Sequence, residues 1–191
     1  DRIAALTRQV RPHVAVVTTI APAHIEMLGS EFAIADAKTE IFEGLEQGGT
    51  AIIPADSPHF ERLRDAALRC GAQVVSFGSA AHANVRLLDV VAAMDGGSLV
   101  TVDMGDRRLC YTVAMPGAHW VANSLAVMAT VRAVGADLGA AGLALAEMAG
   151  LTGRGERIEV PAKGGTALLI DESYNANPAS MAATLEQLGR E

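Results

Sequence analysis

Polar side chains able to hold a ligand are concentrated in the segment Asp171–Pro178, which reads DESYNANP. The segment follows the apolar run Ala167–Ile170, which we interpret as a buried β-strand. In α/β sheets, ligands bind at the carboxyl ends of the strands. The same residue types are also common in turns. Taken alone, the segment therefore leaves open whether it forms a ligand site or an ordinary loop.

A second polar stretch contains His24 and Glu26 and follows the β-branched run His13–Thr19. A neutral imidazole at the end of a strand can bind a metal ion or polarise a phosphate. Glu26 can supply a second ligand or can be a solvated loop charge. For His24, the alternative role is that of a loop histidine with a single hydrogen bond.

Lys38 is unusual because arginine provides most of the positive charge. Of the 15 lysine and arginine residues, only Lys38 and Lys163 are lysines, and Lys163 lies in a turn. A lysine kept inside an amphipathic helix indicates chemistry that arginine cannot perform, since only an amine can lose its proton and react. An ordinary exposed helix residue is the alternative.

Two further candidates lie later in the chain. His119 and Asn123 are four residues apart and so share one face at the start of a predicted helix. An amide suits the hydrogen-bonding edge of a purine, and a helix N-terminus favours anions; capping of the helix is the alternative. Arg154 lies between two glycines and can reach a phosphate or can be a linker residue.

Composition excludes several classes of protein. The net charge of −7 argues against a nucleic-acid surface. The sequence has no run of about 18 apolar residues, the length that would predict a membrane span. Cys70 and Cys110 lack metal-ligand spacing and fit a reduced, cytoplasmic chain. Neither a G-x-x-x-x-G-K-[ST] phosphate loop nor a G-x-G-x-x-G motif is present. The candidates together indicate nucleotide or phosphate chemistry without naming a reaction.

The first half of the chain predicts alternating strands and helices. Strands are expected at 13–19, 50–54 and 73–77, with a helix capped by Ser30 and running to about Glu46. A second helix is expected to have Ser57 as its N-cap and to end at Gly71. This alternation predicts an α/β fold with a parallel sheet.

The second half predicts a different arrangement. Three strands at 85–94, 98–104 and 109–115 form an antiparallel meander, and helices follow at about 119–134 and 138–148. A hairpin over 156–161 and 166–170 turns at Lys163–Gly165, and a last helix starts near Pro178. The Gly-rich stretch Gly150–Gly155 is the expected domain boundary, giving units at 1–150 and 151–191.

In sequence order, these motifs resemble the Mur ligases of peptidoglycan synthesis. The resemblance rests on five segments that cover nearly the whole chain: Thr18–Glu26, Ala37–Phe42, Pro116–Asn123, Gly153–Arg154 and Asp171–Pro178. It implies that 1–150 is most of the central ATP-binding domain, with an antiparallel extension, and that 151–191 begins a Rossmann-like domain. The family's phosphate loop and first domain would precede Asp1, so we expect the chain to start inside a longer protein.

The resemblance also implies residue roles. His24 corresponds to a magnesium-binding histidine, and Lys38 to a carbamylated lysine that helps hold a second magnesium ion. Arg154 would contact an ATP phosphate. The remaining matched residues would lie around the nucleotide, with Asn123 nearest the adenine and Asp171 at the ribose or hinge: His119, Asn123, Asp171, Tyr174, Asn175 and Asn177.

Three positions depart from the family pattern. Thr19 stands where many relatives have Asn, which puts a polar contact beside the magnesium site in doubt. Trp120 replaces a second Asn, so stacking can replace part of the adenine contact. Glu172 replaces a frequent Asp, which leaves open whether Asp171 or Glu172 meets the ribose.

The implied reaction is ATP-driven amide-bond formation with magnesium. The Ser173–Pro178 sequence resembles that of the members which join D-alanyl-D-alanine to a UDP-N-acetylmuramoyl tripeptide. Without a phosphate loop, residues 1–191 alone are expected to be inactive. Two alternatives remain: another Mur-type or folylpolyglutamate-type ligase, and a non-catalytic nucleotide-binding module.

Overall fold

The structure is a computed structural model of the 191-residue chain. It describes residues 2–21, 30–93, 97–148, 153, 156–174, 181–182, 184–185 and 188–189. No helix among these residues is long and apolar enough to cross a membrane.

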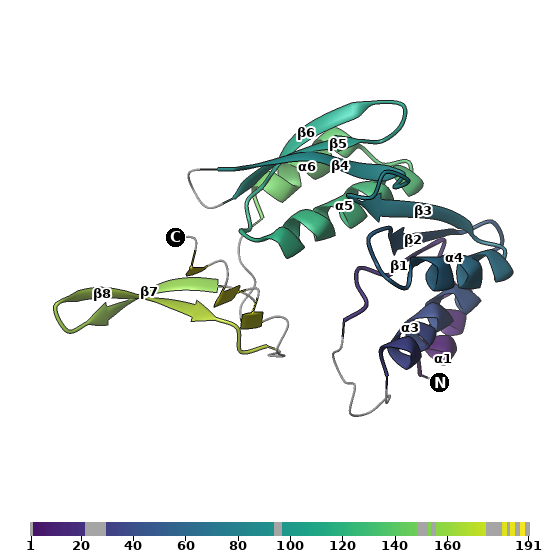
Figure 1. The fold of residues 1–191 in the computed structure, drawn as a ribbon, viewed down its shortest axis with the longest axis horizontal. Coiled ribbons are helices and arrows are strands. Elements are labelled where there is room, and N and C mark those ends of the chain that lie inside the picture. Colours follow the sequence, from purple (N-terminus) through teal and green to yellow (C-terminus); the bar gives the residue numbers. More distant parts are fainter. Residues whose placement is uncertain are drawn as a thin grey trace.

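A six-stranded sheet forms the centre of the molecule (Figure 1). Its strands lie side by side in chain order: β1 (Val14–Val16), β2 (Thr50–Pro54), β3 (Gln73–Gly78), β4 (Val85–Ala92), β5 (Ser98–Asp103) and β6 (Arg108–Val113). The first four strands are parallel, and β4, β5 and β6 pair antiparallel. The predicted parallel sheet with an antiparallel extension is therefore confirmed.

Helices cover both faces of the parallel half of the sheet. These are chiefly α4 (Phe60–Arg69) on one face and α5 (Ala118–Ala133) on the other. Helix α1 (Arg2–Val10) packs against the 3₁₀ helix η1 (Glu40–Gly44), which follows α3 (Glu31–Thr39), and α6 (Leu138–Ala146) packs against β6. Alternation along β2 separates two cores, because successive side chains of a strand point to opposite faces. Ile52 packs in the core that contains α5, whereas Ala51 and Ile53 pack in the core that contains α4.

The antiparallel extension is joined to α5 by a buried polar pair. Tyr111 on β6 and Ser124 on α5 lie within hydrogen-bond distance, with 2.9 Å between their oxygens. The Ser124 hydroxyl also donates to the carbonyl of Val121 at 2.7 Å. The Tyr111–Ser124 bond fixes the first turns of α5 against the sheet, and those turns carry His119 and Asn123.

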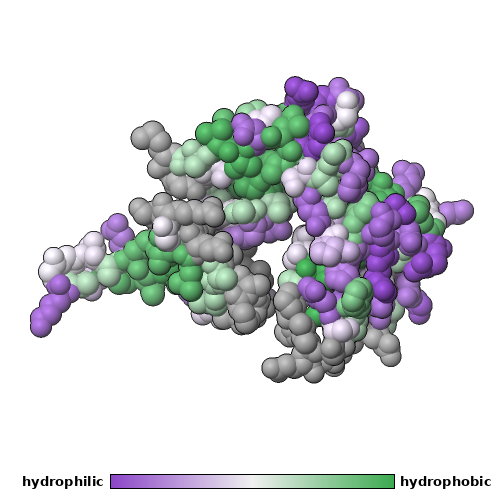
Figure 2. Space-filling view, viewed as in Figure 1, coloured by the Kyte–Doolittle hydropathy of each residue, from purple (hydrophilic) through white to green (hydrophobic). Residues whose placement is uncertain are grey.

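A separate two-stranded hairpin follows, formed by β7 (Glu156–Ala162) and β8 (Gly165–Asp171). The strand predicted at Ala167–Ile170 is confirmed as part of β8, but the prediction that it is buried is wrong, because Leu168 and Leu169 are 47% and 49% exposed. No second layer of described residues covers the hairpin, so its apolar residues remain on the surface (Figure 2). Gly164, with φ of 95°, allows the tight turn between the strands.

Several predicted boundaries need correction. Ser57 is not the N-cap of α4; the helix begins two residues after Pro58, with His59 at the cap, and Ser57 accepts a hydrogen bond from the His59 amide at 3.1 Å. The predicted helix from Ser30 to Glu46 is α3 followed by η1, and the strand predicted at 13–19 contains only three residues. Helix α1 was not predicted. The expected helix start at Pro178 lies outside the described residues.

Candidate functional site

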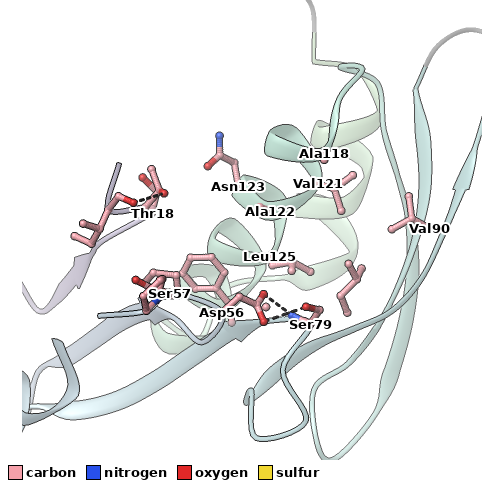
Figure 3. A pocket seen from close by; sticks show the side chains of 17 residues that line it. Thr18, Asp56, Ser57, Ser79, Val90, Ala118, Val121, Ala122, Asn123 and Leu125 are labelled. Atoms are coloured by element: carbon pink, nitrogen blue, oxygen red, sulfur yellow. Dashed lines mark hydrogen bonds between the residues drawn. The ribbon is translucent and has the colours of Figure 1, made fainter. Parts of the chain in front are cut away.

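A pocket of about 490 Å³ lies where the carboxyl ends of β1, β2 and β3 approach the first turns of α5 (Figure 3). Parallel strands place their carboxyl ends at one edge of the sheet, which is the usual ligand position in this class of fold. Three loop ends, β4 and α5 contribute the lining residues: Thr18, Thr19, Ile20, Pro54, Asp56, Ser57, Pro58, Phe77, Gly78, Ser79, Leu87, Val90, Ala118, Val121, Ala122, Asn123 and Leu125.

Of the residues singled out from the sequence as nucleotide contacts, Asn123 lies in this pocket. It extends from the second turn of α5, and its side chain is half-buried. Thr19 also lines the pocket, and its hydroxyl donates to the Ile20 carbonyl at 3.5 Å. The pocket therefore offers an amide and several hydroxyl groups within an otherwise apolar lining.

The charge of the lining limits what the pocket can bind. Among its described residues there is one carboxylate, Asp56, and no lysine, arginine or histidine. A phosphate is held most strongly where cationic side chains offset its negative charge. The pocket as described therefore suits an uncharged part of a ligand, such as a nucleobase or a peptide backbone.

His119 lies one turn before Asn123 but faces a different cavity. This small cavity also contains Trp120, Arg157 and Glu172, so it joins the start of α5 to the segment after β8. Burial lowers the pKa of His119 because it penalises the imidazolium, and the carboxylate of Glu172 opposes that shift. The neutral imidazole is thus favoured at the junction between the two parts of the chain.

Asp171 and Tyr174 lie in the same junction segment and do not line the pocket at the strand ends. Hydrogen bonds from the side chain and amide of Ser173 lower the pKa of Asp171, with the amide nitrogen 2.9 Å from Oδ1. The Tyr174 amide donates to the Gly153 carbonyl at 3.1 Å, and the Tyr174 side chain is 67% exposed. The carboxylate is thereby used to shape a turn, and the phenol faces solvent.

Lys38 lies in the last turn of α3, where its side chain is half-buried, and it does not line the pocket. Five other predicted or discussed residues lie outside the described part of the chain: His24, Glu26, Arg154, Asn175 and Asn177. Within the described residues, no three His, Cys, Asp or Glu side chains lie close enough to hold a metal ion. The predicted magnesium site therefore remains a prediction.

Asp56 and Ser79 were missed from the sequence, although both line the pocket. Asp56 follows β2 and Ser79 follows β3, and three hydrogen bonds join this carboxylate to Ser79 and Ala80. The available signal was positional: Asp56 and Ser79 each come two residues after a predicted parallel strand, at the end where ligands bind.

Comparisons with known proteins agree with this architecture. UDP-N-acetylmuramoyl-tripeptide–D-alanyl-D-alanine ligase of Escherichia coli (strain K12) is 34% identical over 179 residues, which cover 93% of this chain and 38% of that protein. UDP-N-acetylmuramate–L-alanine ligase of Burkholderia cenocepacia (strain HI2424) is 34% identical over 177 residues, covering 91% of this chain and 37% of that protein. The chain thus spans less than two fifths of the length of either relative.

Solved structures and a family model support the same relationship. A crystal structure of MurF from Acinetobacter baumannii superposes with a TM-score of 0.88 at 28% identity, covering 99% of this chain and 40% of that one. The model of the Mur ligase middle domain matches residues 2–131, more than half of the chain. The chain therefore belongs to the Mur ligase family, whose middle domain it contains.

Proposed function

We propose that these residues form the nucleotide-acting part of an ATP-dependent ligase that joins D-alanyl-D-alanine to UDP-N-acetylmuramoyl tripeptide. The observation that carries this proposal is the match to MurF over nearly the whole chain, hairpin included. The E. coli relative bears the name of the same reaction. The pocket supports it, since Asn123 and apolar residues at strand ends suit a nucleobase or a peptide backbone.

The proposed chemistry couples ATP cleavage to amide-bond formation. The terminal carboxylate of the UDP-linked tripeptide attacks the γ-phosphate and forms an acyl phosphate, and ADP leaves. The amine of D-alanyl-D-alanine then attacks the acyl carbon, loses a proton and displaces inorganic phosphate. In this scheme Asn123 orients the adenine, His119 and Asp171 lie near the nucleotide at the junction, and Tyr174, Asn175 and Asn177 line its adenine side.

Positive charge for the phosphates would come from outside the described pocket. Arg154 is our candidate for a phosphate contact. His24 and carbamylated Lys38 are our candidates for holding magnesium, which when bound neutralises phosphate oxygens. Imidazole and carbamate oxygen are both ligands that a divalent cation accepts, but the described residues supply no complete ligand set.

We also propose how the chain is organised and where it works. Residues 1–150 would form the central domain and 151–191 the start of a C-terminal domain, with further domains of the same protein as partners. The exposed apolar hairpin supports this, because an isolated two-stranded hairpin is marginally stable in water. The free cysteines Cys70 and Cys110 fit a reducing compartment such as the cytoplasm.

A substrate-pair assay tests the proposal. Phosphate release by the full-length protein would be measured with UDP-N-acetylmuramoyl tripeptide plus D-alanyl-D-alanine, and separately with UDP-N-acetylmuramate plus L-alanine. We expect release with the first pair only, and none from residues 1–191 alone, which contain no phosphate loop. Release with the second pair alone would favour the activity named for the B. cenocepacia relative.

A further inference from the structure

Asp56 joins the ends of two neighbouring strands at the floor of the pocket (Figure 3). Its Oδ2 accepts a hydrogen bond from the Ser79 amide at 2.7 Å. Its Oδ1 accepts from the Ser79 hydroxyl at 3.0 Å and from the Ala80 amide at 2.7 Å. The carboxylate after β2 therefore holds the start of the loop that leaves β3.

Gly78 shows how closely this carboxylate approaches the loop. Gly78 has φ of 147°, and a Cβ built on it would lie 2.3 Å from Asp56 Oδ2. No real Cβ approaches another heavy atom so closely, so a side chain at position 78 would displace the carboxylate. The observed position of the Asp56 carboxylate therefore requires glycine at position 78.

The far end of the same loop is held by separate contacts. Asn84 Oδ1 accepts hydrogen bonds from the amide and the hydroxyl of Ser76, at 2.8 and 2.9 Å. The ring of His82 lies 4.8 Å from that of Phe60. Asn84 does not line the pocket, so its contacts hold the loop without touching the candidate site.

Asp56 also fixes the hydrogen-bonding character of the pocket floor. A serine hydroxyl has one proton to donate and lone pairs to accept. Because the Ser79 hydroxyl donates its proton to Asp56, its oxygen can offer only lone pairs to a ligand. The floor of the pocket therefore presents an acceptor at a fixed position.

From these contacts, we propose that Asp56 is a positioning residue that holds the Ser79 hydroxyl as an acceptor for an N–H or O–H group of the bound substrate. This rests on the proposed ligase function, which supplies the substrates. Asp56 acts through Ser79, and both of its own oxygens accept hydrogen bonds from the loop. The substrate group is a hydrogen-bond donor such as a peptide amide, an ammonium or the exocyclic amine of adenine.

Steady-state kinetics of the full-length ligase test the proposal, with KM measured for each of the three substrates. We expect Asp56→Ala to raise the KM of one substrate at least tenfold and to change kcat less than threefold. Asn84→Ala is the matched control, because it releases the same loop at its far end; all three KM values should stay within twofold of the wild type. Equal effects of the two substitutions, or a loss of kcat with every KM unchanged, would overturn the assignment.

Two further variants keep the test decisive if Asp56→Ala does not fold. Ser79→Ala keeps both backbone hydrogen bonds to Asp56 and removes only the acceptor, so it should raise the same KM. Ser79→Thr retains a hydroxyl and should restore that KM to within threefold of the wild type. A Ser79→Ala enzyme with wild-type KM values would contradict the proposal.

Amide hydrogen exchange separates this proposal from the ligase function itself. Absence of ligation by the wild-type protein would refute the function, whatever Asp56 does. Whether or not the wild-type protein catalyses ligation, amide hydrogen exchange at Ser79 and Ala80 should be at least tenfold faster in Asp56→Ala than in Asn84→Ala. Unchanged protection at these two amides would show that Asp56 does not hold the loop.

Discussion

At the scale of single residues, Tyr111 is a titratable group with a large pKa shift and a defined hydrogen-bond partner. Burial raises its pKa to about 12, and the hydrogen bond with Ser124 opposes the shift. The phenol is neutral in the folded chain over a pH range in which an exposed tyrosine has already lost its proton. Since the pair holds α5 against β6, its protonation state is linked to the stability of the helix that carries Asn123.

Tyr111→Phe should therefore change the alkaline stability of the chain. Below the ordinary pKa of 10.0 we expect the variant to be less stable by about 1 kcal/mol, the usual net value of one hydrogen bond. As the pH rises from 10 towards 12, the unfolded wild-type chain releases its proton first, so only the wild type loses stability from this group. Urea unfolding of both proteins at a series of pH values measures the difference between their free energies of unfolding. A difference that does not change with pH would contradict the raised pKa of Tyr111.

Lys38 provides a second test at residue scale, in the full-length ligase. Carbamylation needs an amine, so neither arginine nor alanine can form the metal-binding carbamate. We expect Lys38→Ala and Lys38→Arg each to lower kcat by more than a hundredfold, and formate or acetate to restore part of the activity of Lys38→Ala. Near-normal turnover of Lys38→Arg would contradict the carbamate role.

Residue types in the sequence predicted some of the residues in the candidate site. Contacts between residues far apart in the sequence could not be predicted in this way. Asn123 was found because an amide at a helix start is conspicuous, and it lies in the pocket. Asp56 was missed because its partners, Ser79 and Ala80, lie 23 and 24 residues away. Aspartate after a strand is also an ordinary turn residue, so its position after a predicted strand did not by itself distinguish a site residue from a turn residue.

At the scale of elements, α3 depends on a defined cap. The Ser30 hydroxyl accepts a hydrogen bond from the Ala33 amide at 3.1 Å, with extended backbone at Ser30. This side chain satisfies one of the amides that have no partner in the first helical turn. The cap fixes the start of the helix that carries Lys38.

Loss of this cap should weaken the helix measurably. We expect Ser30→Ala to lower the free energy of unfolding by about 1 kcal/mol, and Ser30→Asn to change it by only a few tenths, because asparagine caps about as well as serine. Thermal unfolding of the three proteins measures the difference. Equal losses in both variants would show that the Ser30 hydroxyl does not stabilise α3.

Elements with strong local signals were predictable, and those defined by pairing were less so. Strand β2 was predicted with its observed ends because β-branched residues lie between a double glycine and a proline. Strand β1 is shorter than its apolar run, because its paired register with β2 ends at Val16 and Ile52. The Ala167–Ile170 run is apolar enough for a buried strand, but nothing in its sequence reveals which surface would cover it.

At the scale of the whole molecule, the structure combines a covered sheet with an exposed hairpin. The sheet has a core on each face, so it can position the pocket at its carboxyl edge without the hairpin. The hairpin leaves Ile158, Leu168 and Leu169 on the surface, as expected of a segment that packs against further chain.

We propose above that this chain belongs to an enzyme that couples ATP cleavage to addition of D-alanyl-D-alanine. The most direct test incubates the full-length protein with ATP, magnesium, D-alanyl-D-alanine and UDP-N-acetylmuramoyl tripeptide, and quantifies products by mass spectrometry. We expect UDP-N-acetylmuramoyl pentapeptide, ADP and phosphate in equal amounts, with no multiple turnover when any substrate is omitted. Sustained ADP formation in the absence of the dipeptide, with no pentapeptide formed, would contradict the proposal.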